Sequence, residues 1–411
     1  MICRFISVAL ASLFLLLAPV ATIAAATPFS AAPKSLHTPA GPGSGEPSLA
    51  VAADGTVYMS WFEKLDRGHA LKVARLDGTR WSKPVTVAAG DSFFVNWADF
   101  PTLAVVGPNH LAIAWPWKSG GDTYAYDVRI AQSRDGGRTW GRFTIPHRDN
   151  TPNEHGFVSL VPTRGGVRAV WLDGRKFPPK KPGTDGHDEH GGEMTLRSAV
   201  VAANGALSEE TELDARVCDC CQTGAAATED GMAVVYRDRS DKEIRDISIV
   251  RYRDGRWTEP VPVAADNWMM EGCPVNGPVI RARGERTVVA WFAMVGDRPR
   301  VQAAFSDHGG HGFASAVELP SAEALGRVDA ILLADDTALV SWMEATGSEA
   351  DIRVARVSTT AVIDEPITVA RTSAARASGF PRMVQSGKRV IMAWTEIGSR
   401  NQVRVAAAVL P

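Results

Sequence analysis

The chain has 411 residues, of which 22% are charged and 45% hydrophobic, and its formal net charge is −2. This balance is typical of a globular protein, and it excludes the strongly basic surface with which proteins bind nucleic acid or anionic membranes. A chain of this length exceeds the usual single core, which favours either two domains or a repeat architecture.

Residues 1–26 have the pattern of a signal peptide. Arg4 supplies a positive charge, an apolar run follows from Phe5 to Val20, and three alanines at 24–26 form a small-residue cleavage site. No second run of about 18 apolar residues follows. We therefore expect a periplasmic or secreted, monomeric protein with no membrane span after cleavage; the alternative is an uncleaved membrane anchor.

A unit of four short strands recurs through the rest of the chain. The second strand of each unit ends in an aromatic residue, at intervals of 51 to 65 residues: Trp61, Trp115, Trp171, Tyr236, Trp291, Trp342 and Trp394. Four short alternating strands per repeat are the signature of a β-propeller blade. We predict an all-β fold in which residues 27–411 form one propeller of about seven four-stranded blades. The alternative is six blades with a flanking element.

Two segments test this blade map. The longest interval contains residues 176–192, which are rich in Lys, Pro, Gly, Asp and His, and we interpret them as a loop inserted in the third blade. After Trp394 the chain has room for a third strand at Gln402–Leu410 but not for a fourth. The segment Phe29–Pro33 has the fourth-strand pattern, so we predict that an N-terminal strand completes the last blade and closes the ring.

The segment Ser133–Trp140 reads Ser-Arg-Asp-Gly-Gly-Arg-Thr-Trp, which matches the Asp-box pattern Ser-x-Asp-x-Gly-x-Thr-Trp. Ser306–Phe313 is a degenerate copy with His308 in place of the aspartate. The chain thus resembles the Asp-box, or BNR-repeat, sialidase-like β-propeller superfamily. It also looks like uncharacterised exported bacterial proteins labelled sialidase-like, through four segments: Asn96–Pro101, Glu154–Phe157, Cys218–Thr223 and Gly272–Pro278.

The resemblance to sialidases implies an exo-glycosidase acting on acidic sugars. Those enzymes use three arginines for the substrate carboxylate, a Tyr–Glu nucleophile pair and an Asp acid/base. Where their first arginine is expected, this chain has Glu46. On this hypothesis Asp99 or Glu154 is the acid/base, and the substrate carboxylate is held by Arg197, Arg239 or Arg327.

Unusual residues gather at one phase of the repeat, just before each innermost strand. They are Glu46, Trp97, Asp99, Glu154, His155, Cys218, Cys220, Cys221, Cys273, Asn276, Arg327 and Phe380. The entry ends of the innermost strands ring one mouth of a propeller channel, and loops there usually carry function. We predict a channel-mouth site for a small-molecule, carbohydrate or metal ligand, with catalytic groups at Asp99, Glu154 and His155. We expect Glu46, Trp97 and Asn276 to contact the ligand; the alternative is that part of the set caps the channel.

The cysteines allow three interpretations. Four remain after signal cleavage, at 218, 220, 221 and 273, and in an exported protein they favour disulfides. A soft metal site for copper or zinc, with His155 as a further ligand, is the second interpretation, and a thiol redox centre is the third. His187–His190 is a weaker metal candidate in the inserted loop. A scaffold for protein partners remains a further functional hypothesis.

Overall fold

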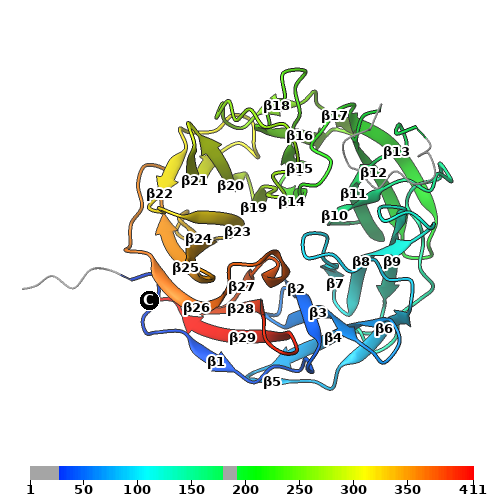
Figure 1. The fold of residues 1–411 in the computed structure, drawn as a ribbon, viewed down its shortest axis with the longest axis horizontal. Coiled ribbons are helices and arrows are strands. Elements are labelled where there is room, and N and C mark those ends of the chain that lie inside the picture. The colour runs from blue at the N-terminus through cyan, green and yellow to red at the C-terminus, as the bar shows by residue number, and fades with distance from the viewer. Residues whose placement is uncertain (1–26, 179–191) are drawn as a thin grey trace, which may run out of the picture.

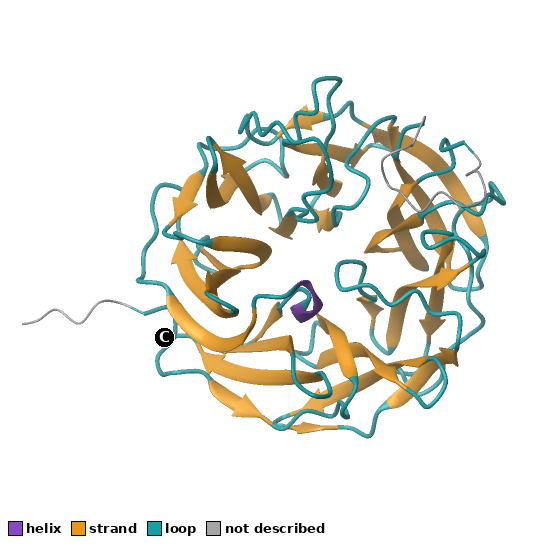
Figure 2. Ribbon diagram, viewed as in Figure 1, coloured by secondary structure: helices purple, strands orange, loops and turns teal. Residues whose placement is uncertain are grey.

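The computed structural model describes residues 27–178 and 192–411. Seven β-sheets stand radially around a central channel (Figure 1). Among the described residues the one helical element is the 3-10 turn η2 (Arg376–Ser378), which lies at the channel, as Figure 2 shows. The predicted all-β propeller with seven blades is confirmed. No helix in the described part of the chain is long and apolar enough to cross a membrane.

The blades follow the chain in order, and each runs from the channel outward. The innermost strands are β2 (Ser44–Val51), β7 (Thr102–Gly107), β10 (His155–Thr163), β14 (Gly224–Thr228), β19 (Val279–Arg283), β23 (Ala324–Leu332) and β27 (Arg382–Ser386). The second strands are β3 (Val57–Lys64), β8 (His110–Lys118), β11 (Gly166–Asp173), β15 (Gly231–Arg237), β20 (Arg286–Val295), β24 (Ala338–Thr346) and β28 (Arg389–Glu396). The third strands are β4 (His69–Asp77), β9 (Tyr126–Ser133), β12 (Thr195–Ala202), β16 (Ile247–Arg253), β21 (Arg298–Ser306), β25 (Glu349–Val357) and β29 (Gln402–Val409).

The outer strands are less regular. They are the pairs β5 (Arg80–Trp81) with β6 (Val85–Gly90) and β17 (Arg256–Trp257) with β18 (Val261–Pro262), and the single strands β13 (Leu207–Asp214), β22 (Val317–Leu319), β26 (Ile367–Ser373) and β1 (Lys34–Leu36). Blade 2 has a three-stranded sheet, and its outer position is marked by a single bridge between Ile130 and Thr144.

The N-terminal strand closes the ring. β1 pairs antiparallel with β29, with Lys34 opposite Ala407, so the last blade is built from both ends of the chain. The strand begins just after the segment predicted for it, because Pro33 has no N–H to donate to the ladder. Phe29 nevertheless anchors that segment: it is buried, in the same apolar cluster as Trp394.

The repeated aromatic residues fill the spaces between blades. Trp61, in the second strand of blade 1, packs in one apolar cluster with Ile391 and Val403 of blade 7. Trp171 of blade 3 packs in the same way with Val128 of blade 2. A buried tryptophan contributes a large apolar area, which explains why one aromatic residue per repeat is enough to mark the blades.

The predicted signal peptide lies outside the described residues, as does most of the predicted inserted loop and with it His187–His190.

The turn after β9 is held by its own side chains. Asp135 Oδ1 accepts the N–H groups of Arg138 and Thr139, each at 2.9 Å, and Ser133 Oγ accepts the N–H of Gly137 at 2.9 Å.

Candidate functional site

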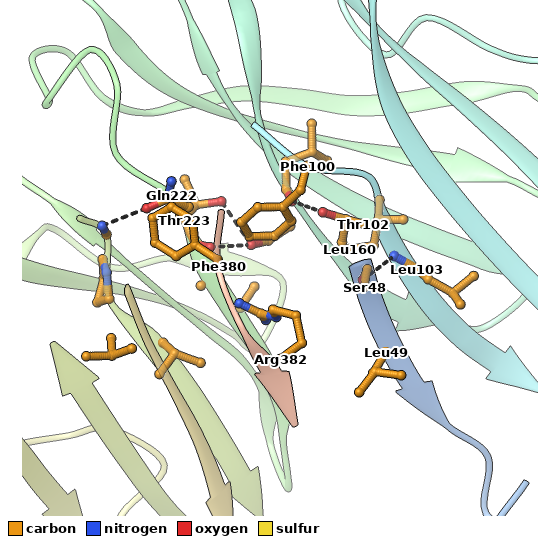
Figure 3. Close-up of a pocket in the computed structure, with 18 of the residues that line it drawn as sticks. Ser48, Leu49, Phe100, Thr102, Leu103, Leu160, Gln222, Thr223, Phe380 and Arg382 are labelled. Carbon is orange, nitrogen blue, oxygen red and sulfur yellow. Dashed lines mark hydrogen bonds between the residues drawn. The ribbon is translucent and has the colours of Figure 1, made fainter. Parts of the chain in front are cut away.

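The channel mouth is closed by a cap. A pocket of about 200 Å³ is lined by residues of all seven innermost strands (Figure 3). Above it the ring of Phe380 lies 5.6 Å from Phe100 and stacks on Trp97 with the centroids 5.9 Å apart. Gln222 of blade 4 holds the segment next to Trp97, because its Nε2 donates to the carbonyl of Ala98 at 2.8 Å. Part of the predicted channel-mouth set therefore caps the channel.

Asn276 and Arg327 belong to this cap. Asn276 Oδ1 accepts the backbone N–H of Arg327 at 2.7 Å. The Arg327 guanidinium is buried, donates to the carbonyls of Ala375 and Gly379 at 3.2 and 3.3 Å, and lies over the ring of Trp97. Burial, assisted by the nearby Arg376, lowers the pKa of Arg327 to about 10. In this structure its donors point at backbone carbonyls.

Two predicted catalytic carboxyl groups meet at a tyrosine. Tyr126, the first residue of β9, is fully buried, and its hydroxyl donates to Glu154 Oε1 at 2.9 Å. Asp99 interacts with the same hydroxyl, and its Oδ1 accepts the backbone N–H of Phe157 at 3.0 Å. The structure thus brings Asp99 and Glu154 together at Tyr126, a residue that the sequence did not lead us to select.

A glycine makes this convergence possible. A Cβ on Gly156 would lie 2.1 Å from Asp99 Oδ2 and 2.7 Å from the Tyr126 hydroxyl oxygen. Neither atom can withdraw easily, because both groups are buried and hydrogen-bonded. Only a residue without a side chain leaves room for both groups here.

The burial of this cluster sets its protonation. Burial raises the pKa of Asp99 to about 7, against the hydrogen bonds from Phe157 and Tyr126 that act to lower it. Burial, followed by the charges of Glu154 and Asp99, raises the pKa of Tyr126 well above its ordinary value. At neutral pH Tyr126 is therefore a neutral phenol, and the Asp99 carboxyl is poised to hold or release a proton.

Glu154 also faces a pocket of about 430 Å³ between the loops of blades 2 and 3. The pocket is lined by Gly121, Asp122, Tyr124, Ala125, Thr151, Pro152, Asn153, Glu154, Arg175 and Phe177. These loops lie on the face where the innermost strands begin, which is the face of the cap. Tyr124 is within electrostatic reach of both Glu154 and Arg376. The lining thus combines a few polar and charged groups with aromatic rings, as ligand pockets commonly do.

His155 lies in a buried network of its own. Its Nδ1 points at the carbonyl of Asn153 at 3.0 Å, and its Nε2 lies 3.2 Å from Asp149 Oδ2 and 3.7 Å from Asp173 Oδ1. Although burial acts to lower it, Asp149 and Asp173 raise the pKa of His155. Both ring nitrogens face oxygen acceptors, an arrangement that favours the doubly protonated imidazole.

A second histidine completes the network. The ring of His147 stacks on that of His155, with centroids 3.7 Å apart and an interplanar angle of 1°. Asp149 bridges the pair, since its Oδ1 lies 2.9 Å from His147 Nδ1. Asp173 is held from the other side by Arg175, whose Nε and Nη2 each donate to it at 2.7 Å. The network fixes the loop between β9 and β10, which carries Glu154.

Glu46 lines a different pocket on the same face. This pocket, of about 620 Å³ between blades 7 and 1, is polar and includes Lys64, Asp66, His69, Arg400 and Asn401. Burial raises the pKa of Glu46 to about 7. Its backbone N–H donates to Thr395 Oγ1 at 3.1 Å. Glu46 and Glu154 thus line different pockets.

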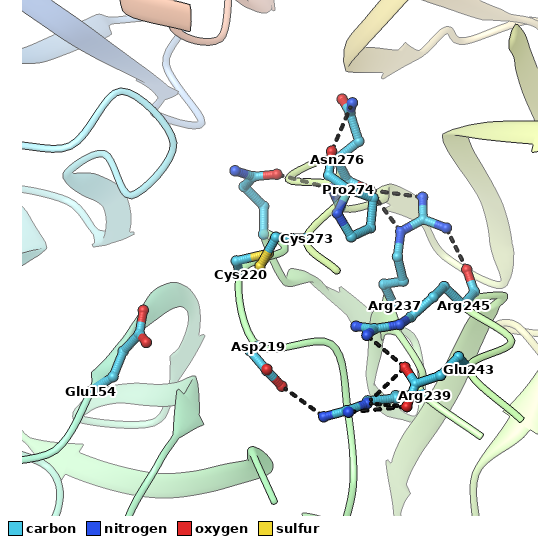
Figure 4. Close-up of a disulfide and its surroundings, with 12 residues drawn as sticks. Glu154, Asp219, Cys220, Arg237, Arg239, Glu243, Arg245, Cys273, Pro274 and Asn276 are labelled. Carbon is cyan, nitrogen blue, oxygen red and sulfur yellow. Dashed lines mark hydrogen bonds and ion pairs between the residues drawn. A yellow bond between two sulfur atoms is a disulfide. The ribbon is translucent and has the colours of Figure 1, made fainter. Parts of the chain in front are cut away.

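The predicted sulfur cluster is partly a disulfide. Cys220 is bonded to Cys273, which joins blades 4 and 5 (Figure 4), while Cys218 and Cys221 are free and buried. The sulfur atoms of Cys218, Cys220 and Cys221 lie within 4.8 Å of one another. Within the described residues His155 lies close to Asp149 and Asp173, in a group separate from the cysteines. The structure therefore does not place it as a further ligand beside them.

The other two predicted arginines are paired inside the protein. Arg197 of β12 donates to Glu212 at 2.7 Å. Arg239 makes three hydrogen bonds to Glu243, at 3.0 to 3.1 Å, and lies 3.6 Å from Asp219. Figure 4 shows these residues. Neither lines the pocket of Glu154.

Sequence reasoning missed Tyr124 and Tyr126. Asp173 and the loop of Glu154 position Arg175, a tertiary relationship that spacing does not reveal. A signal for the tyrosines existed: two of the five tyrosines of the chain are two residues apart, at the entry to one strand.

No family model matches the chain, and no curated protein matches it in sequence. Its fold is similar to that of solved carbohydrate-active enzymes. A PL25 ulvan lyase bound to a glucuronic acid–sulfated rhamnose saccharide has 11% identity and a TM-score of 0.55, covering 92% of this chain and 94% of that one. The polysaccharide lyase Uly1 has 9% identity and a TM-score of 0.50, covering 89% of this chain and 90% of that one. The endosialidase of phage phi92 has 10% identity and a TM-score of 0.51, covering 93% of this chain and 70% of that one. At such identities the likeness shows the fold, a β-propeller used by polysaccharide-cleaving enzymes.

Proposed function

We propose that the protein cleaves glycosidic bonds in an acidic saccharide, and that the sugar binds in the pocket between blades 2 and 3. One observation carries the proposal: Glu154 lines that pocket while its carboxyl accepts a hydrogen bond from the buried, neutral Tyr126. A carboxyl group at a pocket wall, held by a buried partner, is the arrangement that general acid/base catalysis requires.

In this proposal Glu154 transfers the proton at the reacting bond. Tyr126 is a positioning residue, because its buried hydroxyl reaches Glu154 but does not line the pocket. Asp99, on the far side of the phenol, takes up or releases a proton close to neutral pH and so adjusts the charge that Glu154 experiences.

The cations around the pocket support the proposal that the substrate is acidic. Arg175 lines it, and Arg376 lies close enough to Tyr124 to affect its titration. Guanidinium groups match the planar carboxylate of a uronate or a sialate. Two of the structural neighbours, the ulvan lyase and the endosialidase, carry names that refer to acidic saccharides, which supports this class of substrate.

The test is a substrate panel for the purified mature chain. Polysaccharides that contain uronates or sialates are compared with neutral glucans and arabinans, following new reducing ends and the ultraviolet absorbance of unsaturated products. The proposal expects cleavage of at least one acidic polymer and none of the neutral ones. If every acidic polymer stays intact, or if only neutral ones are cut, the proposal is wrong. The product distinguishes hydrolysis from elimination.

We further propose, from the signal-like residues 1–26, that this activity operates outside the cytoplasm.

A further inference from the structure

Cys218 and Cys221 lie side by side in the loop that enters blade 4. Both are buried, and neither takes part in the Cys220–Cys273 disulfide. Their sulfur atoms lie within 4.8 Å of each other, and the two residues have the Cys-x-x-Cys spacing. The neighbouring disulfide fixes this turn to blade 5 and so restricts the separation of the two thiols.

A buried positive charge accompanies the two sulfurs. Arg237 is 1% exposed, and its guanidinium donates to the backbone carbonyls of Asn276, Arg245 and Phe292. In residues 27–178 and 192–411 no carboxylate forms an ion pair with it, although its charge is felt by Asp246. A buried cation is costly without a nearby negative charge.

Cys221 is in position to supply that charge. Its side chain lies within electrostatic reach of Arg237 and Arg245. Its sulfur atom lies within 4.8 Å of that of Cys218, a separation that a single ion between the two sulfurs can bridge.

We propose that Cys218 and Cys221 bind one monovalent copper ion between their two thiolates, with Arg237 as the balancing charge. Monovalent copper prefers soft thiolate ligands. Binding releases the protons of the thiols to solvent, and two thiolates with one monovalent ion carry a net charge of −1 that Arg237 balances.

The same residues disfavour zinc. A structural zinc site takes four nitrogen, sulfur or oxygen ligands. Here Cys220 and Cys273 are bonded to each other, and the histidine nearest in the repeat phase, His155, lies in a separate group with Asp149 and Asp173. Two thiolates are thus available, too few for zinc.

The experiment loads the mature, disulfide-intact protein anaerobically with copper kept monovalent by ascorbate, which leaves disulfides intact. Free copper is then removed with a monovalent-copper chelator, and the copper and protein that remain are measured. We expect one copper per chain, and a copper X-ray absorption spectrum with two sulfur neighbours. The Cys218→Ser and Cys221→Ser variants should lose the copper.

The matched control is the double variant Cys220→Ser/Cys273→Ser, which removes the disulfide but keeps the two thiols and should retain copper. Because serine variants of buried cysteines can fail to fold, the X-ray absorption spectrum of the unaltered protein decides independently of them. Two titratable thiols with no retained copper would overturn the proposal. So would the absence of titratable thiols in the denatured, unreduced protein, since that result means a second disulfide. Saccharide cleavage is measured on the same samples, so failure of this site is distinguishable from failure of the sugar pocket.

Discussion

Tyr126 donates its hydroxyl proton to Glu154 at 2.9 Å while the carboxyl of Asp99 lies on its other side. The three groups come from three different segments: the loop before β7, the start of β9 and the loop before β10. The phenol of Tyr126 therefore connects the buried carboxyl group of Asp99, which can take up or release a proton, with the carboxyl group of Glu154 at the pocket wall, where we propose that the reaction occurs.

The contacts around Asp99 and Tyr126 leave no room for a side chain at Gly156. The substitution Gly156→Ala places a methyl group 2.1 Å from Asp99 Oδ2, so we expect a loss of about 1–3 kcal/mol in the free energy of unfolding, measured by urea titration. The control is Gly107→Ala, because a Cβ there meets no atom within 4 Å. Equal effects of the two substitutions would show that the Asp99–Tyr126 contact is not as close as the structure has it.

Asp99 makes stability depend on pH. Its pKa is raised from 3.8 to about 7 in the folded protein, so the unfolded chain releases this proton at lower pH than the folded chain does. Folding is therefore favoured by this group below about pH 4, and the advantage is lost as the pH rises toward 7, by up to about 4 kcal/mol.

The variant Asp99→Asn should remove that slope and be less sensitive to the change from pH 5 to pH 8 than the unaltered protein. Urea titrations at the two pH values measure it, and Asp297→Asn, at an exposed turn, is the control. A slope that survives in Asp99→Asn would mean that another group is responsible.

The folded protein favours the charged form of His155, whereas it favours the neutral form of Asp99. Its pKa is raised above the ordinary 6.5, so its stabilising effect is fully present below about pH 6.5 and is lost as the pH rises through the folded value. The charged or titratable groups that face it are Asp127, His147, Asp149, Asp173 and Arg175. We expect His155→Gln to lower the melting temperature more at pH 6 than at pH 9.

The exposed residue His308 provides the control, since His308→Gln should leave the melting temperature unchanged at both pH values. A nitrogen-15 NMR spectrum of the ring gives a second readout. Two protonated nitrogens at pH 7 agree with the account, and a single protonated nitrogen contradicts it.

The fold could be predicted from the sequence because the same structural unit, the blade, repeats along the chain. One aromatic residue per blade, such as Trp61 or Trp171, is buried against the preceding blade, and that local requirement appears in the sequence at a regular interval. Ring closure was also predictable, since the count of strands after Trp394 left one missing. The start of β1 was shifted by the lack of an N–H at Pro33, a detail of single hydrogen bonds.

Only part of the candidate site could be predicted from the sequence. The repeat phase brought Asp99 and Glu154 to one face, but their meeting depends on Tyr126, which lies at a different phase of the repeat and was not selected for that reason. The phase also grouped residues with unlike roles: Arg327 and Asn276 build the cap, and His155 belongs to a network with His147. Which side chains turn toward a pocket and which toward a neighbouring blade is decided by packing between blades, which the repeat does not encode.

The most direct measurement compares the kcat/KM of Glu154→Gln and Glu46→Gln on the acidic polymer that the panel identifies. Glu154 directly precedes β10 and Glu46 lies near the start of β2, on the same face, but they line different pockets: Glu154 lines that of Tyr124 and Glu46 that of His69. Removing a general acid/base typically costs a factor of about 10²–10⁴ in rate. The account predicts that loss for Glu154→Gln and a change below tenfold for Glu46→Gln. Full activity in Glu154→Gln, with the loss in Glu46→Gln instead, would contradict it and move the reaction to the pocket between blades 7 and 1.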